Sequence, residues 1–498
     1  MAKLFIFGIG GTGSRVIKSL TMLLASGLKP LNDFEIVPVI IDPHKDNEDL
    51  KRTVSALNNY QRITEKVGTG NGFFSTKLST LQSLDTKGSL GGTYTFTLKD
   101  VESTKFKDYF SYNSLGEENK ALADLIFSGR TINSAKEEID LLEIPMDIGF
   151  VGNPNVGSVV LNQFKHSEEF RVFANNFGKD DRIFIISSIF GGTGAAGFPT
   201  ILKSIRDAAG QSDISNAGFL RDSAIGALTV LPYFNIEVDE KSPINKSDFI
   251  EKTKAALEYY RRNVNSSLNM MYYLGDRHVG KAYENDPGSN GQKNKAHFVE
   301  VAGALAIIDF MNVGDSELST MNGRPVNSVY KEYAIRNNSQ DLSFAELCDG
   351  SRNLLGRSLT QFTLFRKYLQ ENLEESIERQ AWSTSQPSFD KKQKNAQFYG
   401  SNLLGFLRQY DEWLDELGAN ARSFRPFDRQ SDLMNLVRDK PLQANWLGMG
   451  KFKYDTFDTK LNQLDNRQAY SSAEQKLISL FYKTTGEITG EKYGYQQI

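Results

Sequence analysis

Two clusters of small residues each stand between an apolar run and a helical pattern, and their composition suits the binding of an anion. The first is "GIGGTG" and supplies Gly8, Gly10, Gly11, Thr12 and Gly13; the second, "GGTGAAG", supplies Gly191, Gly192, Thr193 and Gly194. Glycine permits backbone angles that a Cβ forbids and lets another group approach the main chain. The first turn of the helix that follows offers free N–H groups and a partial positive charge. We therefore predict two phosphate-binding corners.

A third segment, "GNPNVG", is expected to form another loop of this kind through Gly152, Asn153 and Gly157. Three corners exceed what the diphosphate bridge of a dinucleotide needs, and they suit a nucleotide held mainly through its phosphates. No G-x-x-x-x-G-K-[ST] motif occurs, which excludes a P-loop NTPase.

Buried strands and amphipathic helices must position these corners. Apolar runs predict strands at 3–8, 34–42 and 224–234, alternating with helical patterns, and this alternation favours a doubly wound, mostly parallel α/β sheet. The ligand site is then expected at the carboxyl ends of the strands, where Asp42 ends the second strand. A long apolar helix is expected at about 296–312.

The strand signal fades after residue 312, so we predict two domains. Residues 1–312 would form the nucleotide-binding domain, with an insertion around 51–145, and 313–498 a mainly helical C-terminal domain.

The overall composition indicates an ordinary water-soluble chain. The formal net charge is −3, from 58 basic and 61 acidic residues, so nucleic acid is not an indicated partner. A single cysteine excludes an intrachain disulfide and fits a reducing compartment, and no apolar stretch has the length of a transmembrane helix. We expect a cytoplasmic protein without a signal peptide.

With these motifs in order, the sequence resembles the tubulin/FtsZ superfamily. "FGGTGAAG" is similar to its glycine-rich signature, and "GNPNVG", "GALTVLPYFNIE", "YYLGDRHVG" and "AHFVEVAGALAIIDF" follow in the family's order over residues 1–312. The chain departs at Phe190, Ala195 and Ala196 and looks like a divergent prokaryotic member.

The resemblance implies GTP or GDP as ligand, with Mg²⁺ held by Asp42 through water. Asp276 and Asn294 would lie near the base, although both depart from the family pattern. Asp315 and Glu317 are the candidates for the acids that orient water on a neighbouring subunit's nucleotide, but their spacing after the central helix is not the family's. The implied function is a self-associating cytoskeletal or switch component, forming filaments, with slow or absent hydrolysis that needs a partner subunit.

Two alternatives from other classes stay open. A Rossmann-type dinucleotide oxidoreductase would use Gly8, Gly10 and Gly13, with Asp42 lying 29 residues beyond Gly13 (42 − 13), against the usual ~20. A scaffold without nucleotide function would bind protein partners through the helical C-terminal region.

Overall fold

The computed structural model describes residues 1–498 apart from 44–46, 71, 91–93, 97, 100, 102, 133–136, 147–149, 151–152, 211–213, 234, 237–245, 277–281, 284–293, 335–338, 444–450, 467–468 and 496–498. Gly152, predicted as part of the third loop, lies outside the described residues.

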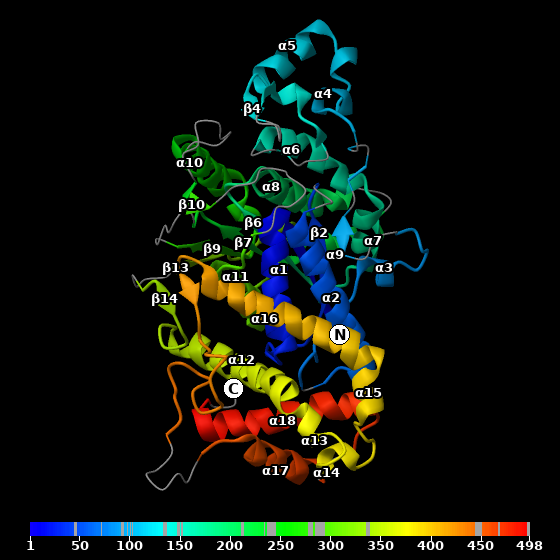
Figure 1. Ribbon diagram of the computed structural model, residues 1–498. Coiled ribbons are helices and arrows are strands. Elements are labelled where there is room, and N and C mark those ends of the chain that lie inside the picture. Colours follow the sequence, from blue (N-terminus) through cyan, green and yellow to red (C-terminus); the bar gives the residue numbers. More distant parts are fainter. Residues whose placement is uncertain are drawn as a thin grey trace.

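A seven-stranded sheet crosses the middle of the molecule, and all its neighbouring strands pair in parallel (Figure 1). In spatial order the strands are β13 (Val329–Ala334), β9 (Met270–Gly275), β7 (Ala224–Val230), β6 (Arg182–Ser188), β1 (Ala2–Ile9), β2 (Phe34–Ile41) and β3 (Thr95–Phe96). Both faces are buried because alternate side chains enter different cores. In β1, Leu4 and Ile6 belong to one apolar cluster, and Phe5 and Phe7 to the other.

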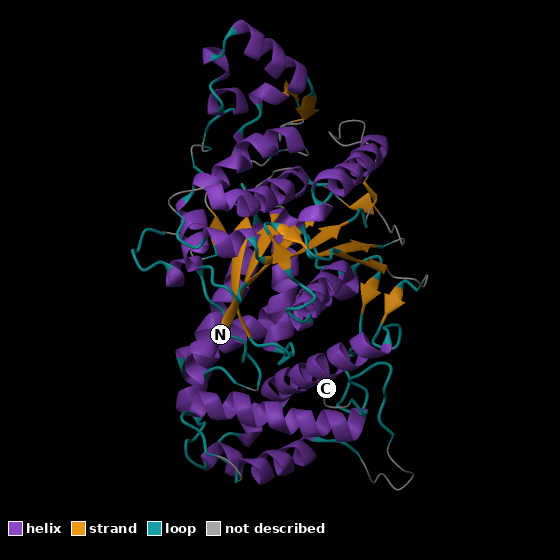
Figure 2. Cartoon of the chain, turned by 180° about the vertical axis from the view of Figure 1, so that it is seen from behind, coloured by secondary structure: helices purple, strands orange, loops and turns teal. Residues whose placement is uncertain are grey.

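Helices cover both faces of this sheet, as Figure 2 shows from behind. One face carries α1 (Gly10–Ala25), α2 (Glu48–Val67) and α11 (Phe298–Asn312). The other carries α6 (Pro154–Leu161), α7 (Glu168–Asn176), α8 (Gly192–Arg206), α9 (Ala217–Arg221) and α10 (Lys246–Asn263). The predicted doubly wound parallel sheet is thereby confirmed.

The C-terminal part is mainly helical, as predicted, and lies at the opposite end of the molecule from α4 and α5 (Figure 1). Its helices are α12 (Asp349–Glu371), α13 (Leu373–Ser376), α14 (Ala381–Thr384), α15 (Lys391–Asn395), α16 (Leu404–Ala419), α17 (Tyr454–Asp465) and α18 (Ala473–Tyr493). A π-helical turn, Phe398–Leu403, leads into α16. The apolar cluster under α1 continues into α12, α16 and α18, so these helices share the core of one sheet face.

Short elements complete the chain. They are α3 (Leu81–Leu84), α4 (Phe106–Tyr109), α5 (Glu117–Ile126) and the pairs β4 (Arg130–Ile132) with β5 (Glu138–Asp140), β8 (Asn235–Ile236) with β10 (Ala282–Tyr283), β11 (Thr320–Met321) with β12 (Arg324–Pro325), and β14 (Asp341–Leu342) with β15 (Ser423–Phe424).

Two features of the sheet were not predicted. Strand β13 follows residue 312 and pairs with β9 at one edge; its sequence "VYKEYA" mixes polar and aromatic residues, as edge strands do, and lacks the continuous apolar run of a central strand. Most of helix α2 and all of strand β3 fall in the range 51–145 expected as an insertion, yet α2 packs along α1 and β3 forms the other edge of the sheet. The division of the chain into two domains at 312 stays a prediction.

Candidate functional site

The order of strands reverses between β1 and β6. From β1 the chain builds outward through β2 and β3, and from β6 through β7, β9 and β13 on the other side. Gly8 near the end of β1 lies beside Ile186 near the end of β6, so the two carboxyl ends are adjacent. Ligands of doubly wound sheets bind in the crevice at this point of reversal. Both predicted glycine corners lie there.

The two glycine corners touch each other. A Cβ built on Gly10, whose φ is +69°, would lie 3.5 Å from the Cβ of Thr193 and 3.9 Å from the backbone nitrogen of Gly194. Helix α1 begins at Gly10 and α8 at Gly192, and within the described chain neither has a side-chain cap or an acidic residue in its first turn. Two uncapped helix N-termini therefore bound one space, which is the arrangement that an anion satisfies.

Not every predicted glycine serves this space. A Cβ on Gly13 would lie 2.7 Å from the Cα of Gly8, and a Cβ on Gly194 would lie 2.7 Å from the carbonyl oxygen of Ser188. Real Cβ contacts with backbone atoms are not this short, so both glycines let the start of a helix pack against the end of its own strand. Gly8 and Gly13 thus have a packing reason that the sequence pattern did not reveal.

The described part of the third loop lies beside the second. Asn153 precedes Pro154, the first residue of α6, and its Nδ2 donates to the carbonyl oxygen of Phe150 (3.2 Å). A Cβ on Gly157 would lie 2.8 Å from the Cβ of Ala196 and 3.2 Å from the carbonyl oxygen of Gly192. The structure therefore places Gly157 against the start of α8, and Asn153 at the start of α6. A role of either residue in ligand binding stays a prediction.

Polar residues that follow β2 flank the first corner. The position of a Cβ on Gly11 is 3.8 Å from Nδ2 of Asn47 and 3.9 Å from Oδ2 of Asp49. The same Nδ2 of Asn47 donates to Oδ2 of Asp42 (3.5 Å). The side chain of Asn47 therefore lies between Asp42 and the first glycine corner.

A buried ion network lies behind these residues, and the sequence did not predict it. Arg15 on α1 donates from Nε to Oε1 of Glu300 (2.6 Å) and from Nη1 to Oδ2 of Asp49 (2.7 Å). Its Nη2 donates to the hydroxyl of Tyr233 (3.3 Å). The predicted base-contacting Asn294 donates to Asp49 from its backbone nitrogen (3.1 Å) and from Nδ2 (2.9 Å). Among the described contacts, Asn294 thus reaches the first corner through Asp49.

Burial changes the proton affinity of this network. Desolvation raises the pKa of the Glu300 carboxyl, and the Arg15 guanidinium opposes that rise. Desolvation likewise lowers the pKa of His297 to about 4. The His297 ring lies 4.8 Å from that of Tyr233 between centroids, so a neutral imidazole packs on the phenol beside the ion network.

The remaining predicted acids are engaged in ion pairs or lie beside them. Asp276, at the end of β9, is held in a buried ion pair by Arg422 (Nε to Oδ2, 2.6 Å). Asp315 pairs with Arg182 (2.7 Å), the first residue of β6, and Asn312 accepts from the backbone nitrogen of Leu31 (2.7 Å). Asp315 and its neighbour Glu317 are therefore at the amino edge of the sheet, opposite the glycine corners.

Two signals in the sequence could have revealed the ion network. Arg15 lies two residues after the first glycine cluster, in the helix that follows it, and Glu300 is an acid within the apolar run "AHFVEVAGALAIIDF". Charged residues are almost never fully buried unless they are paired. Both residues are buried here, and they are each other's partners.

Among known proteins, the chain resembles several solved structures. The chain matches no family model, and it matches no curated protein. The structures that it resembles are those of CetZ and FtsZ. They belong to the tubulin/FtsZ group that the motifs indicated.

The similarity is distant. CetZ from Methanosaeta thermophila is 14% identical with a TM-score of 0.29, and the alignment covers 64% of this chain and 56% of that one. A GTPγS-bound CetZ2 protofilament from Haloferax volcanii is 12% identical with a TM-score of 0.29, covering 63% and 59%. An empty FtsZ dimer from M. jannaschii is 14% identical with a TM-score of 0.24, covering 55% and 45%. The matches thus span about half of those chains, and the site must be argued from its own residues.

Proposed function

We propose that the chain binds a guanine nucleotide, GTP or GDP, through its phosphates at the paired N-termini of α1 and α8. The observation that carries this proposal is the contact between Gly10 and Thr193 at the point where the strand order reverses. Backbone N–H groups of residues 10–13 and 191–194 would hold the phosphate oxygens. The preference for guanine rests on the motif resemblance alone.

Thr193 is the side chain best placed to add a hydrogen bond to a phosphate. It is half-buried, stands in the first turn of α8, and makes no side-chain hydrogen bond to the described residues. Its hydroxyl can donate to an oxyanion, and an anion at this position also interacts favourably with the helix dipole.

The residues beside the first corner suit Mg²⁺. This ion keeps several waters and takes one or two carboxylates together with phosphate oxygens. Asp42 would hold it through water, near Asn47. Among the described residues no group of three or more His, Cys, Asp or Glu is placed to hold a metal by itself, so the phosphates would have to complete the site. Bound Mg²⁺ would neutralise phosphate charge.

Self-association is proposed head to tail, with the carboxyl edge of the sheet in one subunit facing the amino edge of the sheet in the next. The nucleotide would lie at the carboxyl edge, and Asp315 and Glu317 at the amino edge would face the nucleotide of the next subunit. The Asp315 carboxylate is already paired with Arg182, which weakens it as a group to orient water, so we expect slow or absent hydrolysis.

Among the described helices, none combines the length and the apolar composition that a membrane span needs.

A charge placed at the second corner tests the phosphate site. The variant Thr193→Glu puts a carboxylate in the first turn of α8, where it suits the helix dipole and should leave the fold intact. It should also repel phosphate and weaken GTP binding at least about 100-fold in calorimetry with Mg²⁺. Thr193→Ser, which keeps the hydroxyl, should bind within about threefold of the parent.

Equal GTP affinity of the parent and Thr193→Glu would refute the phosphate site. Mass analysis of the nucleotide that copurifies tests the alternatives, since a nicotinamide dinucleotide would identify the oxidoreductase. No binding of any nucleotide, with assembly unchanged in Thr193→Glu, would identify the scaffold.

A further inference from the structure

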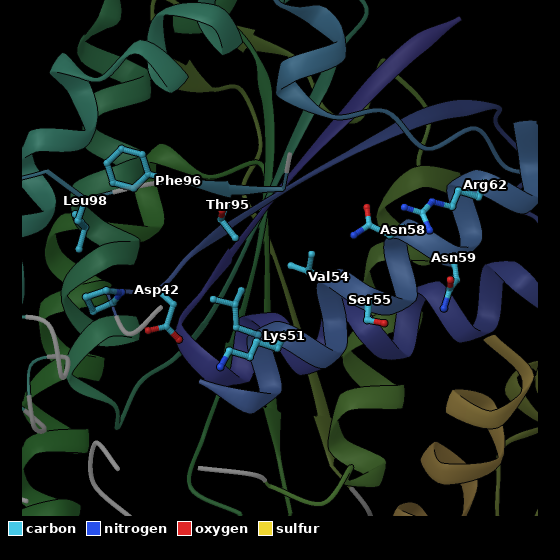
Figure 3. Close-up of a pocket in the computed structure, with 12 residues that line it drawn as sticks. Asp42, Lys51, Val54, Ser55, Asn58, Asn59, Arg62, Thr95, Phe96 and Leu98 are labelled. Atoms are coloured by element: carbon cyan, nitrogen blue, oxygen red, sulfur yellow. The ribbon is translucent and has the colours of Figure 1, made fainter. Parts of the chain in front are cut away.

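A hollow opens beside Asp42 and is lined by α2, not by the helices α1 and α8 of the glycine corners. It has a volume of about 510 Å³ and lies between one face of α2 and the carboxyl ends of β2 and β3 (Figure 3). Small-molecule sites have volumes of roughly 300–1,000 Å³ and combine an apolar wall with a few polar groups. The hollow therefore has the size and mixed lining of a binding site.

Three polar side chains that line this hollow have no hydrogen-bond or ion-pair partner among the described residues. Asn58, Arg62 and Thr95 make no side-chain hydrogen bond or ion pair with any described residue. Their neighbours on α2 differ, because Ser55 accepts from Nε2 of Gln409 (2.8 Å) and Asn59 donates to its Oε1 (3.4 Å). Gln409 of α16 thus satisfies Ser55 and Asn59, which also line the hollow. Helix α2 still offers the amide of Asn58 and the guanidinium of Arg62, and β3 offers the hydroxyl of Thr95.

Charge is distributed unevenly along the hollow. Figure 3 shows Asn58 and Arg62 together at one end, and Asp42 with Leu98 at the other. An anion is attracted by the guanidinium fork of Arg62. At the other end the Asp42 carboxylate repels it, and Lys51, which also lines the hollow, lies on that side. Between the two ends the wall is apolar, from Val54 on α2 and Phe96 on β3.

We propose that this hollow binds a small molecule with an oxyanion on an apolar, ring-sized body. The oxyanion, a carboxylate or a phosphate, accepts from Arg62 and Asn58, and the body packs on Val54, Phe96 and Leu98. The hollow borders the proposed nucleotide site at Asp42, but its oxyanion-binding end at Arg62 and Asn58 does not depend on that proposal.

Phenyl phosphate and 3-phenylpropionate are the probes, titrated into the full chain by calorimetry. Both carry a ring and an oxyanion, and the tighter of the two identifies the preferred headgroup. Arg62→Gln and Asn58→Leu should each weaken the tighter probe at least about tenfold. The matched control Arg379→Gln, at an exposed arginine of the C-terminal region, should leave its affinity unchanged. Benzyl alcohol, which has the ring without the charge, should bind more weakly and respond to neither variant.

Three results would overturn the proposal. The first is no saturable binding of either probe, and the second is equal affinity in the parent, Arg62→Gln and Asn58→Leu. The third is competition between GTP and the probe with a parallel loss of GTP affinity in Arg62→Gln, because the hollow would then be part of the nucleotide site. Loss of probe binding in Arg62→Gln with probe binding kept in Thr193→Glu supports a separate site, whatever GTP itself does.

Discussion

His297 shows how one buried side chain at the site can make stability depend on pH. Its Nδ1 accepts a hydrogen bond from the backbone nitrogen of Val299 (3.0 Å) and so caps the N-terminus of α11. Protonation of Nδ1 would remove this acceptor and place a cation at the positive end of a helix. Burial also disfavours the protonated imidazole, and it lowers the pKa of His297 to about 4.

We expect the free energy of unfolding to fall as the pH falls from about 6.5 to 4. In this range the unfolded state binds a proton at His297 that the folded state does not, so stability is full above pH 6.5 and decreases below it. The loss attributable to this residue is about 3 kcal/mol by pH 4. His297→Asn keeps a capping acceptor without a titrating group, and urea titrations at several pH values should show a flatter profile. Parallel profiles for the parent and the variant would contradict the assignment.

The first glycine corner depends on how closely the start of helix α1 packs against the end of strand β1. Because Gly13 faces the backbone of Gly8, an added methyl group would meet atoms that cannot move aside without separating the helix from the strand. The glycines of this corner therefore fix where the helix N-terminus points before any ligand arrives.

Gly13→Ala should destabilise the fold by more than about 3 kcal/mol or prevent folding. The control is Gly350→Ala in the first turn of α12, where a Cβ meets no atom within 4 Å. There the better helix propensity of alanine should leave stability equal or up to about 1 kcal/mol higher. Denaturant midpoints compare the two, and a Gly13→Ala protein as stable as the parent would mean that α1 does not pack on β1 so closely.

At the scale of the whole molecule, buried charges connect the candidate site to the helical C-terminal region. Glu416 on α16 pairs with Arg52 on α2, and its Oε2 lies 3.9 Å from Nζ of Lys18 on α1. The same Oε2 accepts from the backbone nitrogen of Ala296 (3.1 Å), just before α11. Burial lowers the pKa of Lys18, and Arg52 lowers it further while Glu416 opposes the change. One acid of the C-terminal region thus holds three elements that surround the first corner.

Glu416→Gln should reduce the free energy of unfolding by about 3 kcal/mol, because it removes the ion-pair partner of the buried Lys18 and the closest of the acids that pair with Arg52. Glu487→Gln is the control, since this acid is about half exposed beside Lys460 and its loss should cost less than about 1 kcal/mol. In a double-mutant cycle with Arg52→Gln, the two losses should fall short of additivity by about 1–3 kcal/mol. Additive losses would show that Glu416 and Arg52 do not act together.

The sequence by itself determined the features that depend on neighbours along the chain. Continuous apolar runs predicted the central strands because both faces of such strands are buried, and the glycine clusters predicted helix N-termini because only glycine allows that turn and approach. The doubly wound sheet and the long helix near 296–312 followed from these local patterns. The edge strand β13 did not, because an edge strand carries polar residues and lacks the apolar run.

Only the tertiary structure decided which distant residues meet. Gly10 and Thr193 come together across 183 positions (193 − 10) because β1 and β6 pair in the sheet. Arg15 and Glu300 are 285 positions apart, and no local pattern states that one will neutralise the other. Backbone conformation is set by a few adjacent residues, whereas a buried charge is tolerated only if the completed fold supplies its partner.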